Sequence, residues 1–164
     1  MNAQAVSDQD YYLKPGDHVR FSKTIAECDV YQFAGITGDF APVHTNQQYM
    51  KDSFYGQRIV HGVLLMGFMS TTSSMMVAKV SGEDKEEVPV SLGYDRVRFL
   101  KAALIGDTVT VDYEITAVDA KRSRTVASVE VHNQDGELLA VAQHILKWVR
   151  NDRPAMRPSS PGSA

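Results

Sequence analysis

Residues 62–79 of the chain read GVLLMGFMSTTSSMMVAK, and this stretch decides the fold. Residues 63–69 are apolar on nearly every side of a helix, a pattern typical of a helix that neighbouring elements bury. Residues 70–74 are more polar. The stretch therefore predicts a long helix covered by a larger apolar surface, in which the methionines fill the core: Met66, Met69, Met75 and Met76.

Strand signals begin after Val88, where the hydrophobic period changes to two. Residues 133–136, NQDG, form a turn signal between two of these alternating runs. The predicted strands cover residues 18–23, 109–117, 125–131 and 137–149. One antiparallel sheet covered by one apolar helix is an α+β arrangement.

Two shorter helices are predicted before the long one. Thr24 and Glu27 fit a capping box at the start of the first helix, and Gly38 is suited to end it. Asn46 is a good cap for the second, which ends near Gly56. The loop between the two helices is expected to be stiff, because it contains a proline.

The length of 164 residues is that of one domain. We expect an N-terminal segment over residues 1–14, a single domain over residues 15–150, and a disordered tail over residues 151–164. The tail is rich in Pro, Ser and Gly and has few side chains that pack.

The net charge and the distribution of apolar residues limit where in the cell the protein is expected and which partners it is expected to bind. A net charge of -3 gives no reason to expect a nucleic-acid partner. The first ten residues lack the features of a secretory signal, and the longest apolar run is too short to span a bilayer. We therefore expect a cytoplasmic protein without a membrane partner. Cys28 is the one cysteine, which we expect to be a small buried side chain, and no zinc-ligand cluster is present, so no metal is expected.

The loop over residues 38–44, GDFAPVH, places a carboxylate and an imidazole five residues apart. Asp39 and His44 are suited to orient a water, take its proton and return a proton to a substrate. Histidine fits this work because its ordinary pKa, about 6.5, lies near the working pH. The alternative is that Asp39 caps the preceding turn while His44 is an ordinary hydrogen-bonded histidine, and the spacing alone leaves both open.

Residues 31–70 resemble the hydratase motif of the MaoC-like family, which includes the (R)-specific enoyl-CoA hydratases. The motif is an Asp, a Pro and then a His, followed by an Ile-Val-His-Gly element that opens the central helix; in this chain these are Asp39, Pro42, His44 and residues 59–62. The similarity continues through residues 91–93, 97–99 and 105–107 and covers roughly residues 15–150. Ala41 departs from the family pattern, which has an asparagine there.

The resemblance implies a hot-dog fold, in which a curved antiparallel sheet wraps around a long central helix. It also implies a homodimer or a multiple of dimers, formed by joining the sheets. An open sheet edge is a liability, which is a physical reason for such pairing.

The same resemblance implies roles for three residues. Asp39 and His44 would activate the water that attacks C3 of a 2-enoyl-CoA, giving a (3R)-hydroxyacyl-CoA, or would catalyse the reverse dehydration. Gly62 matches the residue whose backbone N–H binds the thioester oxygen, and a helix N-terminus offers such a free amide. CoA is then part of the substrate and no cofactor is needed, with acyl-carrier protein as an alternative carrier.

Other residues are assigned less directly. Ser70 falls where the (R)-specific hydratases have a serine near the catalytic pair, the alternative being a hydroxyl bonded to the helix backbone. Tyr94 and Arg96 lie on the strand expected to approach the substrate tunnel, where Arg96, Arg98 and Lys101 would meet CoA phosphates or simply be solvated. His61 is interpreted as structural.

Two other functions fit the same fold. A hot-dog thioesterase would hydrolyse the thioester with an acidic residue, although the Asp39–His44 motif speaks against it. A non-catalytic acyl-thioester-binding domain is the third possibility, with Ala41 as its sequence support. Chain length and branching of the acyl group are not determined by the sequence.

Overall fold

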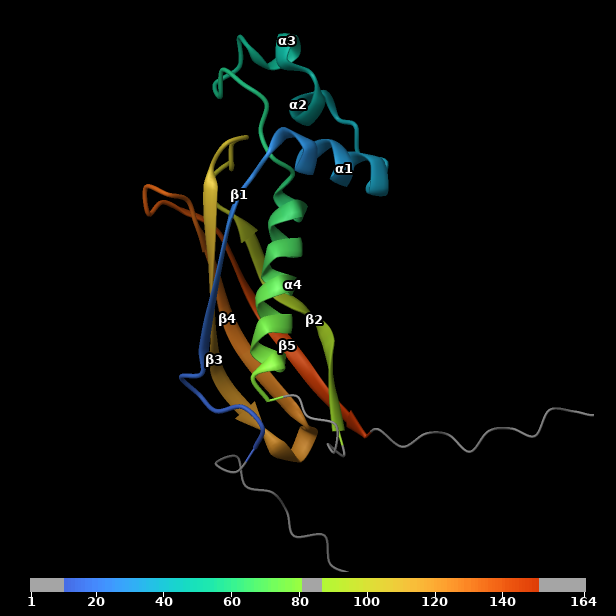
Figure 1. Cartoon of the computed structure of the whole chain (residues 1–164), viewed down its shortest axis with the longest axis vertical. Coiled ribbons are helices and arrows are strands. Elements are labelled where there is room, and N and C mark those ends of the chain that lie inside the picture. The colour runs from blue at the N-terminus through green and yellow to red at the C-terminus, as the bar shows by residue number, and fades with distance from the viewer. Residues whose placement is uncertain (1–10, 81–86, 151–164) are drawn as a thin grey trace, which may run out of the picture.

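The computed structural model describes residues 11–80 and 87–150, which form a twisted five-stranded antiparallel sheet with a long helix lying across one face (Figure 1). The strand order is β1-β3-β4-β5-β2. The strands are β1 (His18–Thr24), β2 (Glu87–Phe99), β3 (Thr108–Asp119), β4 (Arg124–His132) and β5 (Leu138–Arg150), and a short 3-10 helix, η1 (Ala120–Arg122), joins β3 to β4. The long helix is α4 (Gly62–Ala78), so the α+β prediction and the predicted helix are both confirmed.

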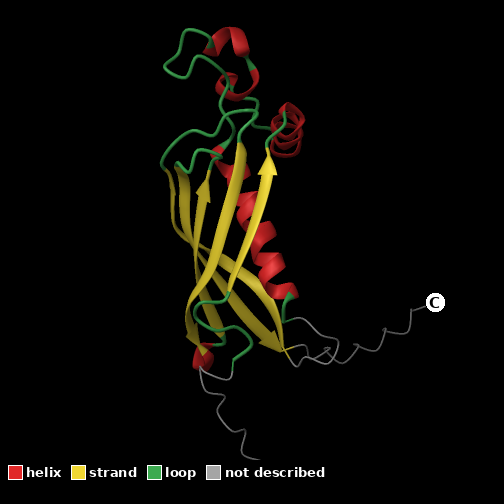
Figure 2. Ribbon diagram, turned by 60° about the vertical axis from the view of Figure 1, so that its left-hand side comes forward, coloured by secondary structure: helices red, strands yellow, loops and turns green. Residues whose placement is uncertain are grey.

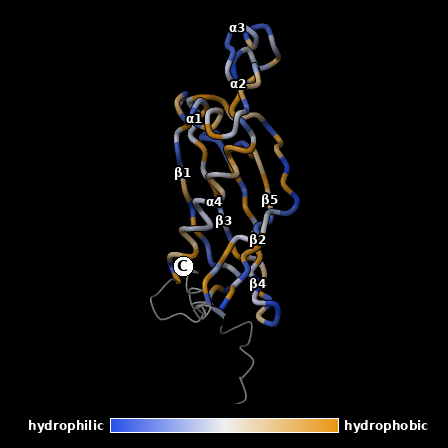
Figure 3. Tube along the Cα trace, turned by 90° about the vertical axis from the view of Figure 1, so that its right-hand side faces the viewer, coloured by the Kyte–Doolittle hydropathy of each residue, from blue (hydrophilic) through white to orange (hydrophobic). Residues whose placement is uncertain are grey.

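The core lies between α4 and the sheet, because alternate residues of the central strands are buried. Hydrophobic and hydrophilic residues alternate along the strands in Figure 3. Fully burying one such aliphatic side chain stabilises the fold by roughly 1.5–3 kcal/mol. The fully buried apolar residues of the sheet are Val109, Val111, Tyr113, Ile115, Ala127, Val129, Val131, Leu139 and Ala140. Helix α4 adds Leu65, Met69 and Met76 to this layer.

One face of α4 is not covered by the sheet. Val63 is 56% exposed and Met75 is 39% exposed, whereas Met69 and Met76 are fully buried. The prediction of core-filling methionines is therefore correct for Met69 and Met76 and also for Met66, which is partly buried against the core, and it is wrong for Met75.

Three short helices lie beyond the N-terminal end of α4 (Figures 1 and 2). They are α1 (Glu27–Thr37), α2 (Pro42–Thr45) and α3 (Gln47–Met50). Helix α1 ends at Gly38 in the left-handed conformation, with φ of 82°, as the sequence predicts. The expected stiff loop contains the single turn of α2, which begins at Pro42, a favoured residue at the first helical position.

The start of α1 differs from the prediction. Thr24 belongs to β1, and its hydroxyl hydrogen-bonds Thr108 of β3 at 2.7 Å instead of capping a helix. The Asp29 carboxylate caps α1 instead, by accepting the Ala26 N–H at 2.8 Å. The prediction for Cys28 is also wrong, because its side chain is exposed on the solvent side of α1. The predicted cap at Asn46 is confirmed, since its side chain accepts a backbone N–H at 3.0 Å.

The packed body begins before residue 15. Tyr11 and Leu13 are buried, and the Tyr11 ring meets Trp148 edge to face at 5.8 Å. The predicted tail over residues 151–164 lies outside the described residues. Among the residues that are described, no helix is long and apolar enough to cross a membrane.

Candidate functional site

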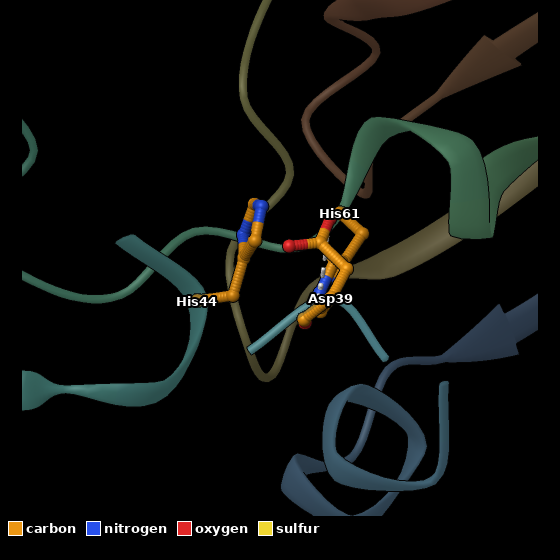
Figure 4. Close-up of side chains that lie close together, drawn as sticks. All are labelled: Asp39, His44 and His61. Carbon is orange, nitrogen blue, oxygen red and sulfur yellow. Dashed lines mark hydrogen bonds and ion pairs between the residues drawn. The ribbon is translucent and has the colours of Figure 1, made fainter. Parts of the chain in front are cut away.

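Three polar side chains converge at the N-terminal end of α4 (Figure 4). Asp39 follows α1, His44 lies on α2, and His61 immediately precedes α4. One possible ligand atom from each lies within 4.8 Å of the other two. The structure therefore brings Asp39 and His44 together, which is the arrangement that their catalytic interpretation requires, and adds His61 to them.

The Asp39 carboxylate is held by its own loop. The left-handed turn at Gly38 ends α1, and the Asp39 N–H then donates to the Thr37 hydroxyl at 3.3 Å. One carboxylate oxygen, Oδ1, accepts the Ala41 N–H at 3.2 Å. The other oxygen lies 3.9 Å from His61 Nε2, and the side chain is 51% exposed. A carboxylate with one oxygen anchored and the other accessible is well suited to bind a water.

The His44 ring has one nitrogen engaged and one available. Its Nδ1 lies 2.8 Å from the carbonyl oxygen of Ile59. A carbonyl only accepts hydrogen bonds, so Nδ1 carries the proton and Nε2 of the neutral ring keeps its lone pair. Within residues 11–80 and 87–150, Nε2 has no hydrogen-bond partner. This tautomer gives His44 an acceptor that can take a proton from water.

His61 packs against both members of the pair. It is only 2% exposed, and its Nε2 donates to the Asp39 carbonyl oxygen at 3.0 Å. Its ring stacks on His44, with centroids 3.8 Å apart and planes 29° apart, and Phe33 lies 4.9 Å away. The interpretation of His61 as a packing residue agrees with this burial, but the residue also orients the site directly.

The same three residues offer ligands for a metal ion. The lone pair of an imidazole nitrogen lies in the plane of its ring, and the rings of His44 and His61 are stacked rather than edge to edge. The two ring planes differ by only 29° with centroids 3.8 Å apart, an arrangement that does not aim two lone pairs at one nearby ion, and each ring already bonds a backbone carbonyl. The geometry favours proton transfer, and the absence of a metal stays a prediction.

A cavity of about 240 Å³ opens beside His44 and the first turn of α4. It is lined by His44, Tyr55, Ile59, Val60, Gly62, Leu65 and residues 99–103. The Gly62 amide has no hydrogen-bond partner among the described residues, as the geometry of a helix start dictates. A Cβ at Gly62 would lie 3.0–3.1 Å from atoms of the Phe99 ring, so any larger residue here would require that ring to shift by a few tenths of an ångström. The cavity thus offers an apolar space with a free amide and a free imidazole nitrogen at one end.

Among the remaining predicted residues, Lys101 lines this cavity and Ser70, Tyr94, Arg96 and Arg98 do not. Ser70 is exposed on α4. Burial raises the pKa of the Tyr94 phenol to about 12, opposed by the nearby Ser70 hydroxyl. Arg96 is exposed in an irregular part of β2, with a φ of 52°. Lys101 pairs with Glu137 at 2.6 Å.

A second polar group, formed by His144, Tyr113 and Ser91, was not predicted. His144 on β5 is fully buried, and burial lowers its pKa to about 4. Its Nδ1 lies 2.8 Å from the Tyr113 hydroxyl and its Nε2 lies 2.9 Å from the Ser91 hydroxyl. The signal for it was present in the sequence, because residue 144 falls in the inward-facing half of the alternation in β5.

Comparisons with known proteins agree on one family. The family model described as a MaoC like domain matches residues 10–136. An (R)-specific enoyl-CoA hydratase of Rhodospirillum rubrum is 34% identical over 106 residues, which cover 65% of this chain and 68% of the relative. A 3-hydroxybutyryl-CoA dehydratase of Methylorubrum extorquens is 29% identical over 122 residues, covering 71% of this chain and 73% of the relative.

The solved structures agree with the fold. The structure of an (R)-hydratase from A. caviae involved in PHA biosynthesis has a TM-score of 0.73 and 25% sequence identity, and the match covers 82% of this chain and 96% of that one. The predicted hot-dog fold, with its sheet around a central helix, is confirmed.

Proposed function

The chain belongs to the MaoC-like domain family and is a hydro-lyase, and on this premise we propose that it is an (R)-specific enoyl-CoA hydratase. The proposed reaction is the reversible syn addition of water to a 2-enoyl-CoA, which gives a (3R)-hydroxyacyl-CoA. The observation that carries the proposal is that His44 and Gly62 line one cavity, while a carboxylate oxygen of Asp39, which lies outside the lining, is within 4.8 Å of a nitrogen of His44.

In this reaction Asp39 and His44 hold the attacking water between them. As the water oxygen bonds to C3, its proton passes to the pair, and a proton is delivered to C2 from the same face. Two interacting groups titrate as a unit, so the pair is assigned this acid–base work together. Hydrogen bonds to the backbone hold both side chains in place before the substrate arrives, which lowers the cost of reaching the transition state.

The Gly62 amide has a different role in the proposal. Negative charge develops on the thioester oxygen as water adds, and a preorganised donor stabilises this charge. The Gly62 N–H lies at the first turn of α4, where the helix dipole is positive and the amide has no intrahelical partner. Removing one such donor typically costs about 100- to 1000-fold in rate.

We further propose a CoA thioester as the substrate, with acyl-carrier protein as the alternative carrier, and a homodimer or a multiple of dimers as the working assembly. Strand β2 supports the assembly, because it is a thirteen-residue edge strand with exposed apolar side chains at Val88, Val90 and Leu92. Sedimentation should show dimers at micromolar concentration, and a stable active monomer would contradict the proposal.

The function is tested with crotonyl-CoA and a series of longer and branched 2-enoyl-CoAs. Loss of the enoyl-thioester absorbance measures hydration, chiral chromatography identifies the product, and a thiol reagent measures thioester hydrolysis in parallel. We expect hydration to the (3R) product without release of CoA. Release of CoA without hydration would identify a thioesterase, and a mainly (3S) product would contradict the proposed geometry.

A further inference from the structure

The guanidinium of Arg58 lies between α1 and the segment that leads into α4. Its side chain is only 14% exposed. Nη2 pairs with the Glu27 carboxylate at 2.5 Å, and Nη1 donates to the Tyr31 hydroxyl at 3.0 Å. The guanidinium carbon also lies 5.7 Å from the centre of the Tyr31 ring. These contacts tie residue 58 to two successive turns of α1.

The contact with Tyr31 extends to one side of His44. The Tyr31 hydroxyl accepts from Arg58 and donates to the carbonyl oxygen of Thr45 at 3.3 Å. Thr45 follows His44 in α2. The backbone on this side of the imidazole is therefore bonded to a tyrosine whose hydroxyl Arg58 fixes.

The other side of His44 is held by the next residue in the chain, Ile59. Its N–H donates to the Val43 carbonyl at 3.1 Å, and its own carbonyl oxygen lies 2.8 Å from His44 Nδ1. A displacement of Arg58 would therefore move the group that sets the tautomer of His44. The backbone on one side of His44 is thus bonded to the Arg58 guanidinium through Tyr31, and the other side and the ring are bonded to Ile59, the residue that follows Arg58.

One buried donor of Arg58 lacks a partner within the described part of the chain and its ion pair is screened, so these contacts are not optimised for stability alone. Arg58 Nε is buried and has no hydrogen-bond partner among the described residues, while Glu27 is 56% exposed and therefore forms a screened ion pair. A lysine at this position would avoid the unsatisfied Nε donor, but it lacks the planar fork that reaches Glu27 and Tyr31 together. Arginine at position 58 has the geometry to contact Glu27 and Tyr31 at the same time.

We propose that Arg58 is a positioning residue for the hydration reaction. By fixing Tyr31 and Ile59 it keeps His44 Nδ1 on the Ile59 carbonyl, and it thereby keeps Nε2 unprotonated and directed at the water. The expected change in kcat rests on the proposed function, whereas the expected change in the His44 tautomer does not. The two are measured separately.

The kinetic test compares Arg58→Gln and Arg58→Lys with a matched control. The control is Arg20→Gln, which breaks an ion pair of 2.7 Å between β1 and Asp112 of β3 at a side chain that is 63% exposed and does not line the cavity. Because a displacement of about 1 Å in a catalytic group costs on the order of a hundredfold, we expect Arg58→Gln to lower kcat by roughly 10- to 100-fold. KM should change by less than about twofold, since Arg58 is not a residue that lines the cavity. Arg58→Lys should recover little of the loss, and the control should have wild-type kcat.

The structural test is the ¹⁵N NMR spectrum of the His44 ring. We expect a single Nδ1–H tautomer in the wild type and in Arg20→Gln, and a mixture of tautomers in Arg58→Gln. Tyr31→Phe removes only one hydroxyl, so it tests the same bonds if Arg58→Gln does not fold, and it should shift the His44 tautomer in the same direction.

The two possible failures are distinguishable. If the wild type hydrates enoyl-CoA and folded Arg58→Gln has wild-type kcat, the positioning role is overturned while the proposed function stands. If the wild type has no hydratase activity, the proposed function fails, and the tautomer of His44 alone decides the inference. An unchanged tautomer in both Arg58→Gln and Tyr31→Phe would then overturn it.

Discussion

The region around His44 and the region around His144 contain the same side chain in opposite surroundings. Both rings are stacked, His44 on His61 at 3.8 Å and His144 on Tyr94 at 4.2 Å. His44 lies half-buried on α2, near the N-terminal end of α4, with one nitrogen bonded to a backbone carbonyl. His144 lies in the core with both nitrogens bonded to hydroxyls, one of them that of Tyr113.

The hydrogen bonds of the two rings explain why only one of these histidines is available for proton transfer. Neither burial nor stacking separates the two rings as clearly as the number of occupied nitrogens. A hydroxyl can donate to one ring nitrogen and accept from the other, so the bonds of His144 satisfy the neutral ring completely. The carbonyl that holds His44 fixes one tautomer and leaves the other nitrogen free. His44 is therefore equipped to exchange a proton, and His144 is equipped to remain neutral.

The largest expected effect is the loss of kcat on removing the proton-transfer groups in the region around His44. Asp39→Asn and His44→Gln should each lower kcat by at least about a hundredfold, the low end for general acid–base catalysis. Both side chains contribute little to the core, so the variants should remain folded. Asp52→Asn alters an exposed neighbouring carboxylate and is the control. Steady-state kinetics with crotonyl-CoA measure the effect, and wild-type turnover in either folded variant would remove the proposed role of the pair.

The second prediction concerns acid and the buried histidine. Burial lowers the pKa of His144 from 6.5 to about 4, so the unfolded chain binds a proton in this interval while the folded chain does not. Stability should therefore be intact above pH 6.5 and decline as the pH falls toward 4, by roughly 3 kcal/mol at most from this residue. Urea unfolding of the wild type and of His144→Leu measures it. A slope that is the same in both proteins between pH 6.5 and 4 would contradict the assignment.

A smaller effect is expected from one hydroxyl in the second region. Tyr113→Phe leaves His144 Nδ1 buried without its partner, which should cost roughly 1–3 kcal/mol of unfolding free energy. The melting temperature should fall by about 2–4 °C for each kcal/mol lost. The kcat should stay within about twofold of the wild type, because Tyr113 does not line the cavity. A loss of kcat in the folded protein would show that the two regions are coupled.

The smallest effect is expected at Ala41, where the chain departs from the family pattern. The Ala41 N–H already holds Asp39 Oδ1, and a good added hydrogen bond is worth about 1 kcal/mol. Ala41→Asn should therefore change the rate on crotonyl-CoA by less than about tenfold. A selective loss on branched substrates would show that Ala41 makes room for the acyl group. Equal collapse of kcat/KM on every substrate would contradict both interpretations.

The sequence predicted the helix and the strands in which apolar residues recur with a regular period. The helix from Gly62 and the strands followed from periodicity, because one side of each element must be buried. The start of α1 was missed because Thr24 and Asp29 both suit a helix cap, and pairing of β1 with β3 decides between them. Cys28 was misjudged because composition says nothing about which side of a helix faces solvent.

At the candidate site the sequence predicted the pair Asp39 and His44. It did not predict the contacts of His61 and Arg58 that hold this pair in place. Asp39 and His44 share a short loop, so their meeting follows from local geometry. The bonds of His61 to Asp39 and of Arg58 to Glu27 join residues 22 and 31 positions apart. Such contacts depend on how α1 packs over the start of α4, which no local pattern encodes.

The irregular edge of β2 has a consequence for behaviour at high concentration. Its pairing with β5 shifts register between Ser91 and Gly93 and again between Asp95 and Arg98, and Arg96 has a positive φ. Bulges of this kind twist an edge and interrupt its row of amides, so an incoming strand can extend only a short ladder. Growth of cross-β fibres requires flat strands that stack without end. Strand β2 should therefore be a poor template for an endless ladder, and association along this edge should close on a finite number of copies.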